Sequence, residues 1–498
     1  MMLHRPDIPP SLEVERASVT PVNKRETRSL YKARVKIFPK RVHGFFRSLK
    51  WQIMAVTLAI YYLTPWIRWD RGAGAPDQAV LIDMPARRFY FFFIEIWPQE
   101  FYYIAGLLIM AGIGLFLLTS TVGRAWCGYA CPQTVWVDLF LVIERWIEGD
   151  RAARIKLDSA PWTFDKLRKR ASKHALWILT GVATGGAWIF YFADAPTLAA
   201  RLAHFDAPPI AWITIAVLTA TTYLFGGLMR EQVCTYMCPW PRIQAAMLDE
   251  DSLVVTYNDW RGEPRGRHQK VQQETGQAGG DCVDCNQCVV VCPMGIDIRD
   301  GQQLECITCA LCIDACNGVM DKVGKPRGLI SYATLKDYNA STREAPVHTS
   351  LRSLIRPRTI IYVTLWSLVG LGMLFALLTR ERLDGNVLHD RNPLAVRLAD
   401  GTIRNGYTIK ILNMKTIPRD FTLRTEGIDG ALMTTAGSDA ARASRLLVAV
   451  PRDDVRVLKV YVSASPQDLD AAETPLRFIV EERGGGESAI YDAMFARP

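Results

Sequence analysis

Histidine is scarce in this chain, and the signatures of several common cofactors are missing. Only 7 of the 498 residues are histidine. His43, His174, His204 and His389 are scattered, without a spacing that suits paired haem ligation. There is no C-x-x-C-H sequence for c-type haem. A flavin or nicotinamide fingerprint is also missing, so the sequence points to none of these cofactors.

The first part of the chain holds no early apolar run. Residues 1–50 are polar and basic, so we expect no secretory signal there. The whole chain has 59 basic and 50 acidic residues, a formal net charge of +9. No nucleic-acid module is visible, and basic residues beside membrane helices explain this excess better. We therefore expect a membrane partner and no nucleic acid.

The chain is rich in cysteine, and eight of its 12 cysteines form two matching runs. Each run has the spacing C-x2-C-x2-C-x3-C, which bacterial ferredoxins use to hold two [4Fe–4S] clusters. In that pattern the fourth cysteine of each run ligates the other cluster. We therefore expect Cys282, Cys285, Cys288 and Cys316 around cluster 1, and Cys306, Cys309, Cys312 and Cys292 around cluster 2. Pro293 follows the first run, whereas Asn317 replaces that proline in the second.

Apolar residues are concentrated in five stretches long enough to cross a bilayer, which takes about 20 residues. The stretches are 51–69, 101–120, 175–192, 209–229 and 359–379. A sixth piece, 89–97, is too short to span and is rich in aromatics, so we expect it to be interfacial or re-entrant. Glu95 within it is a candidate carboxylate of a quinone or ion site, with an acid at headgroup level as the simpler interpretation.

Basic residues set the expected orientation. They crowd 24–50 and 145–173, whereas Arg201 is the only one at 193–208. The positive-inside rule then places the N-terminus and segment 230–358 in the cytoplasm, and the segment after the fifth span outside. Disulfides are disfavoured in the reducing cytoplasm. Zinc sites need four ligands rather than two interlocked runs of four, so we favour the paired clusters over both alternatives.

The other four cysteines form a repeat of the sequence C-x-Y-x-C-P. The two pairs are Cys127 with Cys131, and Cys234 with Cys238. Cysteines four apart share one face if a helix continues through them, so the pairs could converge into one four-thiolate site near the inner membrane surface. Soft thiolates favour Cu(I), zinc or iron–sulfur. A dithiol/disulfide relay and a purely apolar role stay open as well.

These motifs, with their flanks, are shared with a known family. The chain resembles the cytochrome c oxidase accessory protein family CcoG, also called FixG or RdxA, in the runs TVGRAWCGYACPQTVWVDLF, CTYMCPWPRIQAAM and CVDCNQCVVVCPMGIDIRDGQQLECI. The resemblance covers nearly the whole chain and all twelve cysteines. It implies a protein of the bacterial inner membrane that assembles cbb3-type cytochrome oxidase by reducing Cu(II) to Cu(I) on the cytoplasmic side. Copper ions, copper chaperones or transporters and oxidase assembly factors are the partners it implies.

Residues 383–498 differ from the rest, because short alternating apolar runs are separated by Gly, Pro and Asp. Strands are predicted at 408–412, 421–424, 445–450, 457–462 and 476–480, which indicates an antiparallel β-sandwich. The family resemblance implies an immunoglobulin-like domain there, on the periplasmic side. A docking module for a periplasmic partner and a stabilising cap are both open uses.

The predicted architecture is an α-helical membrane protein with about five transmembrane helices, an inserted two-cluster ferredoxin-like domain and a C-terminal immunoglobulin-like β-sandwich. The expected segments are a basic cytoplasmic start (1–50), four spans with the first C-x-Y-x-C-P motif (51–229), a cytoplasmic segment (230–358) with the ferredoxin region at about 275–330, a fifth span (359–380) and the outer domain (383–498). Three functions are weighed: reduction of Cu(II), quinol-linked electron transfer to a periplasmic partner, and a non-catalytic assembly scaffold.

Overall fold

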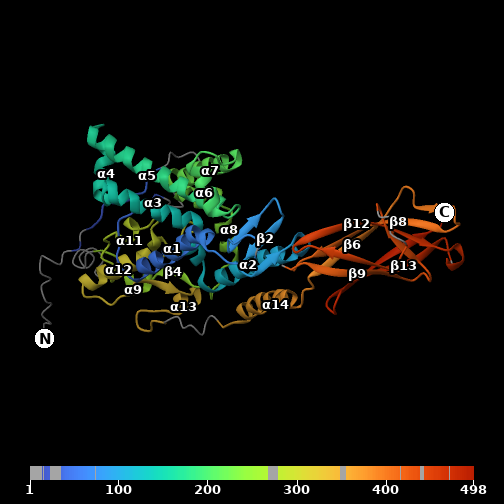
Figure 1. The fold of residues 1–498 in the computed structure, drawn as a ribbon. Helices are drawn as coiled ribbons and strands as arrows, with labels where there is room; N and C mark the ends of the chain where they lie inside the picture. Colours follow the sequence, from blue (N-terminus) through green and yellow to red (C-terminus); the bar gives the residue numbers. More distant parts are fainter. Residues whose placement is uncertain are drawn as a thin grey trace, which may run out of the picture. The chain divides into compact units, whose positions relative to one another are not determined.

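The computed structural model describes residues 14, 16–22, 35–72, 75–266, 279–347, 355–415, 417–437, 442–469 and 471–497. Most of the predicted basic start and the first residues of the predicted ferredoxin region lie outside this description. The chain divides into two compact units (Figure 1). Unit 1 comprises Met1–Trp69 and Gln78–Leu371, and unit 2 comprises Asp70–Asp77 and Gly372–Pro498.

Unit 1 is mainly helical. Its helices are α1 (Phe45–Leu63), α2 (Tyr102–Val122), α3 (Pro132–Glu148), α4 (Arg151–Ser159), α5 (Phe164–Ile189), α6 (Ala195–Ala203), α7 (Pro209–Thr222), α8 (Trp240–Met247), α9 (Asp259–Gly262), α11 (Gln287–Val290), α12 (Leu311–Lys322), α13 (Leu335–Ala340) and α14 (Pro357–Thr379), whose end belongs to unit 2. Side-chain caps fix some of the starts, since Thr163 accepts a hydrogen bond from the backbone of α5 and Asp194 from that of α6.

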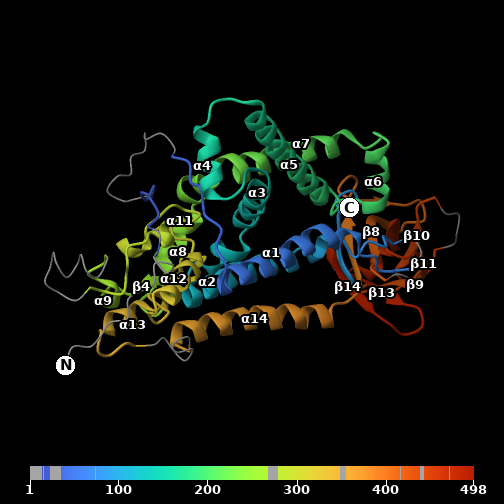
Figure 2. The ribbon, with the colours of Figure 1, turned by 90° about the vertical axis from the view of Figure 1, so that its left-hand side faces the viewer.

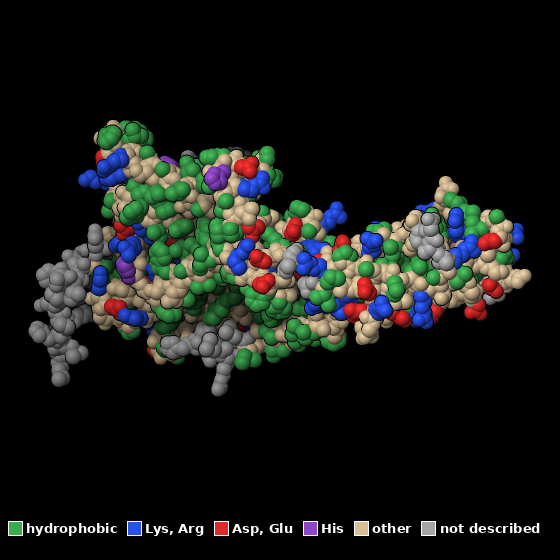
Figure 3. Space-filling model, viewed as in Figure 1, with side chains coloured by type: hydrophobic (Ala, Val, Ile, Leu, Met, Phe, Trp, Pro, Cys, Tyr) green, Lys and Arg blue, Asp and Glu red, His purple; other side chains and the backbone are tan. Residues whose placement is uncertain are grey.

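Three helices in the described part of the chain are long and apolar enough to cross a membrane. They are Pro98–Val122, Pro209–Met229 and Pro357–Thr379. Large apolar side chains on them face outward, and Figure 3 shows hydrophobic side chains spread over the helical unit. These three helices therefore confirm three of the five predicted spans, at 101–120, 209–229 and 359–379. Helices α1 and α5 cover the other two stretches, but both carry basic residues in their N-terminal halves, and the count of five stays a prediction.

Helices α2 and α14 lie side by side in unit 1. Figure 2 shows both helices along one side of this unit. The Trp366 indole Nε1 donates a hydrogen bond to the Met110 carbonyl oxygen at 3.1 Å. The methyl of Met110 also lies 3.1 Å from the position that a Cβ on Gly370 would take. Small residues at such contacts allow the backbones of membrane helices to approach closely.

Residues 80–96 form a small antiparallel sheet, which includes most of the piece 89–97 that was predicted to be interfacial or re-entrant. An interfacial position for this piece stays a prediction. Its strands are β1 (Val80–Asp83), β2 (Arg88–Phe91) and β3 (Ile94–Ile96), in that order. Glu95 lies on β3, and its carboxylate forms an ion pair with Arg88 of β2 at 3.2 Å. The alternating side chains of the segment fit a sheet, which apolar content alone did not reveal.

The cysteine runs lie in a small α/β region of unit 1. Strands β4 (Val254–Tyr257) and β5 (Ile330–Ala333) pair antiparallel, with the pairs Val254–Ala333 and Tyr257–Ile330 at their ends. The region has a buried core that includes Val255, Ile313 and Leu329 together with several of the cysteines. Cys288 lies in α11, and Cys312 and Cys316 lie in α12. The two cysteine runs therefore share one core with the β4–β5 ribbon.

Unit 2 is a β-sandwich of two antiparallel sheets. One sheet has the order β10-β12-β8-β6 with β7 also paired to β8, and the other has the order β11-β9-β13-β14. The strands are β6 (Leu383–His389), β7 (Ala395–Arg397), β8 (Ile403–Asn413), β9 (Arg419–Glu426), β10 (Leu432–Thr435), β11 (Arg445–Val450), β12 (Asp454–Ala464), β13 (Glu473–Glu482) and β14 (Ser488–Ala496). Tyr407, Phe421 and Phe478 are fully buried between the sheets. All five predicted strands are present.

Candidate metal centres

Two cavities in unit 1 are lined by the cysteines of the two runs. Site I is lined by Cys282, Cys285, Cys288 and Cys316. Site II is lined by Cys292, Cys306, Cys309 and Cys312, and its cavity also touches Cys288. Both groups bring together the first three cysteines of one run and the last cysteine of the other, as the ferredoxin pattern predicts. Their assignment as cluster ligands stays a prediction.

The backbone of the two runs adopts the same unusual conformation at matching positions. Asp284 and Asn286 in the first run have φ values of 53° and 58°, and Thr308 and Ala310 in the second have 50° and 58°. Left-handed conformations cost these non-glycine residues roughly 1–2 kcal/mol each. Such conformations persist where a ligand site over-determines them. The duplicated loop is therefore a cradle that fits a group bound by the surrounding thiols.

The thiols of both sites are well buried. Burial, with a smaller contribution from neighbouring thiols, raises the pKa of Cys292 and of Cys316 to about 12. Burial raises the pKa of Cys306 to about 11. Cysteine ligates metal as the thiolate, so a metal core that fills these sites replaces protons with its own positive charge. The donor sets thus fit [4Fe–4S] clusters.

Asn317 is part of helix α12, which explains why the second run lacks the proline of the first. The helix continues through Cys316 and ends at Lys322, and a proline at position 317 would interrupt it. The Asn317 side-chain oxygen accepts a hydrogen bond from the Gly328 backbone N–H at 3.0 Å. This contact holds the loop before β5 against the helix that carries Cys316.

The two C-x-Y-x-C-P motifs form matching π-helical turns rather than continuous α-helix. The turns are Trp126–Ala130 and Val233–Met237. In each, the second cysteine closes the turn, because Cys131 N–H donates to Trp126 O and Cys238 N–H donates to Val233 O, both at 2.8 Å. Helix α3 begins at Pro132 and α8 directly follows Pro239. Single π-turns of this kind are frequent at functional sites.

The two turns meet, and their four cysteines form a set that we call site III (Cys127, Cys131, Cys234 and Cys238). Cys127 and Cys234 belong to one buried cluster. The Cys127 thiol donates a hydrogen bond to the Gln244 side-chain oxygen on α8 at 3.0 Å. Burial, followed by the other three thiols, raises the pKa of Cys234 to about 12, so all four lie within electrostatic range. The two turns thus lie close together, and Cys238 is the exposed member of the set. That the four thiols form one metal or redox site stays a prediction.

Site III is in direct contact with site II. A Cβ on Gly128 would lie 2.6 Å from the Ile307 carbonyl oxygen and 3.0 Å from the Cys309 Cα, so the two backbones touch. The Tyr129 hydroxyl donates a hydrogen bond to the Cys309 carbonyl at 3.2 Å. Arg124 is buried between them: its charge lowers the pKa of both Cys127 and Cys306, opposing the effect of burial.

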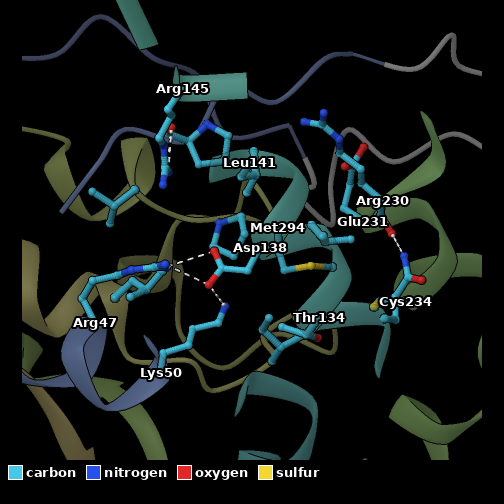
Figure 4. A pocket seen from close by; sticks show the side chains of 17 residues that line it. Arg47, Lys50, Thr134, Asp138, Leu141, Arg145, Arg230, Glu231, Cys234 and Met294 are labelled. Carbon is cyan, nitrogen blue, oxygen red and sulfur yellow. Dashed lines mark hydrogen bonds and ion pairs between the residues drawn. The ribbon is translucent and has the colours of Figure 1, made fainter. Parts of the chain in front are cut away.

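A further cavity adjoins both sites (Figure 4). Cys234 lines it from site III, and Pro293 and Met294, which follow the first cysteine run, line it from the site II side. Asp138 lies in its wall and pairs with Arg47 at 2.9 Å, while Lys50 stands 3.8 Å away. Burial works to raise the pKa of Asp138, but Lys50 and Arg47 hold it below the usual range.

Several residues around the sites were not identified from the sequence. Besides Arg124 and Gln244, the Tyr332 hydroxyl on β5 donates to the Thr308 carbonyl at 2.6 Å. Segment 16–22 crosses the site I loop, where the Ala17 N–H donates to the Cys285 carbonyl at 3.0 Å. The sequence offered one sign of these residues, which is that Arg124 lies close to the first C-x-Y-x-C-P motif. The other contacts join distant parts of the chain.

Comparison with known proteins finds relatives along the whole chain. Residues 229–335 match a 4Fe-4S dicluster domain, 104–148 match a 4Fe-4S binding domain, and 373–498 match the IG-like fold at the C-terminal of FixG. The nitrogen fixation protein FixG of Rhizobium meliloti (strain 1021) is 60% identical, with 100% of this chain and 99% of that protein covered. The proteins RdxB and RdxA of Cereibacter sphaeroides are 54% and 53% identical, with 94% of this chain and 98% of each covered.

Proposed function

Because the chain belongs to the FixG/RdxA/RdxB family of membrane iron–sulfur redox proteins, we propose that it reduces Cu(II) to Cu(I) on the cytoplasmic side for the assembly of a cbb3-type cytochrome oxidase. One observation supports this most: the backbone contact between Gly128 of site III and Cys309 of site II. It joins eight thiols that suit one-electron carriers to four further thiols, of which Cys238 is exposed.

The chemistry needs one electron for each copper ion. Iron–sulfur clusters, when bound at sites I and II, supply single electrons. Each Cu(II) takes up one electron and becomes Cu(I), and a reduced carrier protein restores that electron. Thiolates are soft ligands and bind Cu(I) more favourably than a hard ion, so the site III thiols stabilise the product. The Gly128–Cys309 contact gives the electron a short path through the protein.

Copper reaches site III from the side of Cys238. The cavity beside Cys234 is the other approach, and the charged residues in its lining are Arg47, Lys50, Arg145, Arg230, Asp138 and Glu231. Basic side chains exceed acidic ones there, which disfavours a bare metal cation. Cys238 is exposed to solvent and carries no such barrier in its own turn, where the neighbouring Tyr236 and Met237 are also exposed.

The test is cupric reduction by the purified full-length protein without oxygen. The protein is reduced with dithionite, freed of reductant by gel filtration, and mixed with Cu(II) and a chromogenic Cu(I) chelator. We expect Cu(I) to appear with wild type and much more slowly with Cys127→Ser and with Cys234→Ser. Ala130→Ser, in the first turn but not a thiol, is the matched control. Undiminished rates in both cysteine variants would remove site III from the reaction.

The site geometry also bears on the number of spans. Helix α2 leads into the first turn and residues 209–229 lead into the second, and both turns contribute to site III. Two spans that end at the same face of the membrane need a return crossing between them. Helix α5 fits this crossing, because its 26 residues span roughly 39 Å at 1.5 Å per residue. It packs on α7, where a Cβ on Gly181 would lie 3.1 Å from the Thr219 carbonyl oxygen. We include α5 among the spans.

Helix α1 meets the same requirement. Near its start Arg47 pairs with Asp138 on α3, the helix that follows the first turn of site III. Near its end the Tyr61 hydroxyl donates to the Thr184 carbonyl at 2.7 Å, close to the far end of α5. A helix that makes both contacts runs from one face of the membrane to the other. Five crossings then leave the three thiol sites on one side and unit 2 on the opposite side.

The excess of basic residues around α3, α4 and the start of α5 supports a cytoplasmic position for the thiol sites and a periplasmic one for unit 2. There the β-sandwich is available to dock a periplasmic partner. Reporter fusions test this arrangement. Alkaline phosphatase fused after Asp206 and at the end of unit 2 is expected to be active, and a fluorescent protein fused after Ala160 is expected to fluoresce. The opposite pattern would reverse the orientation, and activity after both Ala160 and Asp206 would exclude a crossing by α5.

A further inference from the structure

The cavity beside Cys234 holds more positive charge than its own carboxylates balance (Figure 4). Its charged lining residues are four basic ones, Arg47, Lys50, Arg145 and Arg230, and two acidic ones, Asp138 and Glu231. Arg230 has a partner outside this lining, because its guanidinium donates a hydrogen bond to the Glu144 carboxylate at 2.6 Å. The other three basic side chains are grouped around Asp138, and two of them are poorly paired.

Lys50 is the first of these two, because Arg47 already occupies both oxygens of Asp138. Arg47 Nη1 donates a hydrogen bond to Asp138 Oδ1 at 2.9 Å, and Arg47 Nη2 stands 2.9 Å from Asp138 Oδ2. The Lys50 Nζ atom is 3.8 Å from the same carboxylate, which is too long for a hydrogen bond. Among the described residues it donates no hydrogen bond, although its side chain is only 4% exposed. A buried ammonium without acceptors is unfavourable, so this cation fits a further anion.

Arg145 is the second poorly paired cation. In the described part of the chain its Nε atom is buried and has no hydrogen-bond partner. Asp150 Oδ1 lies 4.0 Å from that atom, and the backbone N–H of Arg41 already donates to both oxygens of Asp150. Arg145 and Lys50 line the same cavity. An anion in this cavity therefore has spare donors from two directions.

The place of the cavity in the fold favours a phosphate group as that anion. Lys50 lies near the start of α1, and Arg230 directly follows the apolar helix that ends at Met229. Basic pockets at the cytoplasmic ends of membrane helices are typical sites for the phosphate headgroups of anionic lipids. The cavity encloses about 510 Å³ of space, part of it open to solvent, so a soluble phosphate can also enter. Phosphate oxygens accept strong hydrogen bonds from both guanidinium and ammonium groups.

We propose that this cavity binds a phosphate-bearing anion between Lys50 and Arg145, either the headgroup of an anionic membrane lipid or a soluble phosphate. The anion supplies the acceptors that these two cations lack, while Asp138 stays paired with Arg47. Cys234 lines the same cavity, so the bound anion lies beside site III. Such binding needs neither copper nor electron transfer, and its test therefore stands apart from that of the proposed function.

The test is calorimetric titration of the full-length protein, purified in detergent and stripped of lipid, with inorganic phosphate and separately with phosphatidylglycerol. Saturable binding of phosphate identifies a soluble source, and binding of phosphatidylglycerol alone identifies a lipid headgroup. We expect Lys50→Gln and Arg145→Gln each to weaken the binding at least about tenfold, because each removes a charged hydrogen-bond donor. Lys336→Gln is the matched control, because its Nζ stands 3.9 Å from Asp251 but its side chain is 69% exposed. Phosphatidylcholine and sodium chloride at equal ionic strength are the control ligands.

The stability of the stripped protein gives a second measurement. Without an anion, Lys50→Gln removes a cation that has no acceptor while Asp138 keeps Arg47, so this variant is expected to unfold at the wild-type temperature or above it. A much lower unfolding temperature would show that Lys50 serves only to pair with Asp138, and would overturn the site. Failure of both ligands to bind, an equal response to sodium chloride, or binding that Arg145→Gln leaves unchanged would overturn it as well. If Lys50→Gln does not accumulate, the Arg145→Gln titration still decides.

Discussion

Gly128 is the residue at which site III touches site II, so its replacement by alanine probes that contact directly. The added Cβ would lie 2.6 Å from the Ile307 carbonyl oxygen, and ordinary contact begins at 3.4 Å, so the two backbones must separate by about 0.8 Å. Two hydrogen bonds resist such a shift of the site II loop. The Tyr129 hydroxyl donates one to the Cys309 carbonyl, and the Tyr332 hydroxyl donates the other to the Thr308 carbonyl.

The loss of stability in Gly128→Ala can be estimated, because the close contact is the source of strain considered for the added methyl. Gly128 does not have a left-handed φ, so alanine is compatible with its backbone conformation. Overpacking of a tight contact costs about 1–3 kcal/mol. We expect Gly128→Ala to lower the free energy of unfolding by that amount. Because the strain falls between sites II and III, we also expect slower Cu(II) reduction, with iron at sites I and II retained.

Three measurements on purified protein check this prediction: thermal unfolding, iron content and the rate of Cu(II) reduction after rapid mixing. Gly112→Ala in α2 is the matched control, because a Cβ there would meet nothing within 4 Å. An alanine in that helix interior is neutral or mildly stabilising. If Gly128→Ala behaves like Gly112→Ala in stability and in rate, the two backbones do not touch and the proposed electron path is wrong.

Three further perturbations test the surroundings of site III. Tyr129→Phe removes a hydrogen bond to the site II backbone, so it is expected to lower the free energy of unfolding by about 1 kcal/mol and to slow copper reduction. Tyr236→Phe, at the exposed matching position, is expected to do neither. Equal effects of the two variants in thermal unfolding and in rate would contradict the assigned contact. Arg124→Gln removes a positive charge beside Cys306 of site II, so site II is expected to become harder to reduce, with a more negative midpoint in an EPR-monitored redox titration. An unchanged midpoint would exclude the electrostatic role. Burial raises the pKa of Cys127 to about 11 and that of Cys234 to about 12, so metal binding must displace their protons. When site III is reconstituted from apoprotein, its metal affinity is therefore expected to rise from pH 6 to pH 8, about tenfold per pH unit for each proton released. An affinity that does not change with pH would show that these thiols are not ligands.

The grouping of the cysteines at sites I and II was predictable because these cysteines recur at short, fixed intervals in the sequence. The cavities of sites I and II group the cysteines of the two runs as the interlocked ferredoxin pattern predicts. The repeat of C-x-Y-x-C-P likewise indicated that two pairs converge. The expectation of a continuing α-helix through each motif was wrong, because each motif forms a π-turn. A single four-thiolate site stays a prediction.

The alternation of apolar and polar residues predicted only some of the strands of unit 2. The five predicted strands lie within β8, β9, β11, β12 and β13. The missed strands are β6, β7, β10 and β14, and β6, β10 and β14 are the edges of their sheets while β7 is a short addition to β8. Strands β7 and β10 are short and β6 contains the polar run Asp384–Asn386, as edge strands often do. This reason does not apply to β14, which has nine residues with alternating burial. The β1–β3 sheet was missed because aromatic content suggested a membrane interface.

Contacts between distant segments could not be predicted from local patterns. Arg124 belongs to the first motif, but nothing in its neighbourhood reveals that the Leu304 carbonyl, next to the second cysteine run, accepts a hydrogen bond from it. The close approach of Gly128 to Cys309 is likewise a property of the folded chain. The first contact joins residues 180 positions apart, and the second joins residues 181 positions apart.

The two C-x-Y-x-C-P turns have the same backbone plan but face different surroundings. Each span before them ends at a left-handed residue, Gly123 with φ 61° and Arg230 with φ 46°, four positions before the first cysteine. In the first turn the tyrosine is buried against the site II backbone. In the second, Tyr236 is 49% exposed, and the turn ends at the exposed Cys238. Under the proposed function, the first turn would therefore receive electrons from site II, and the second would meet copper from solution.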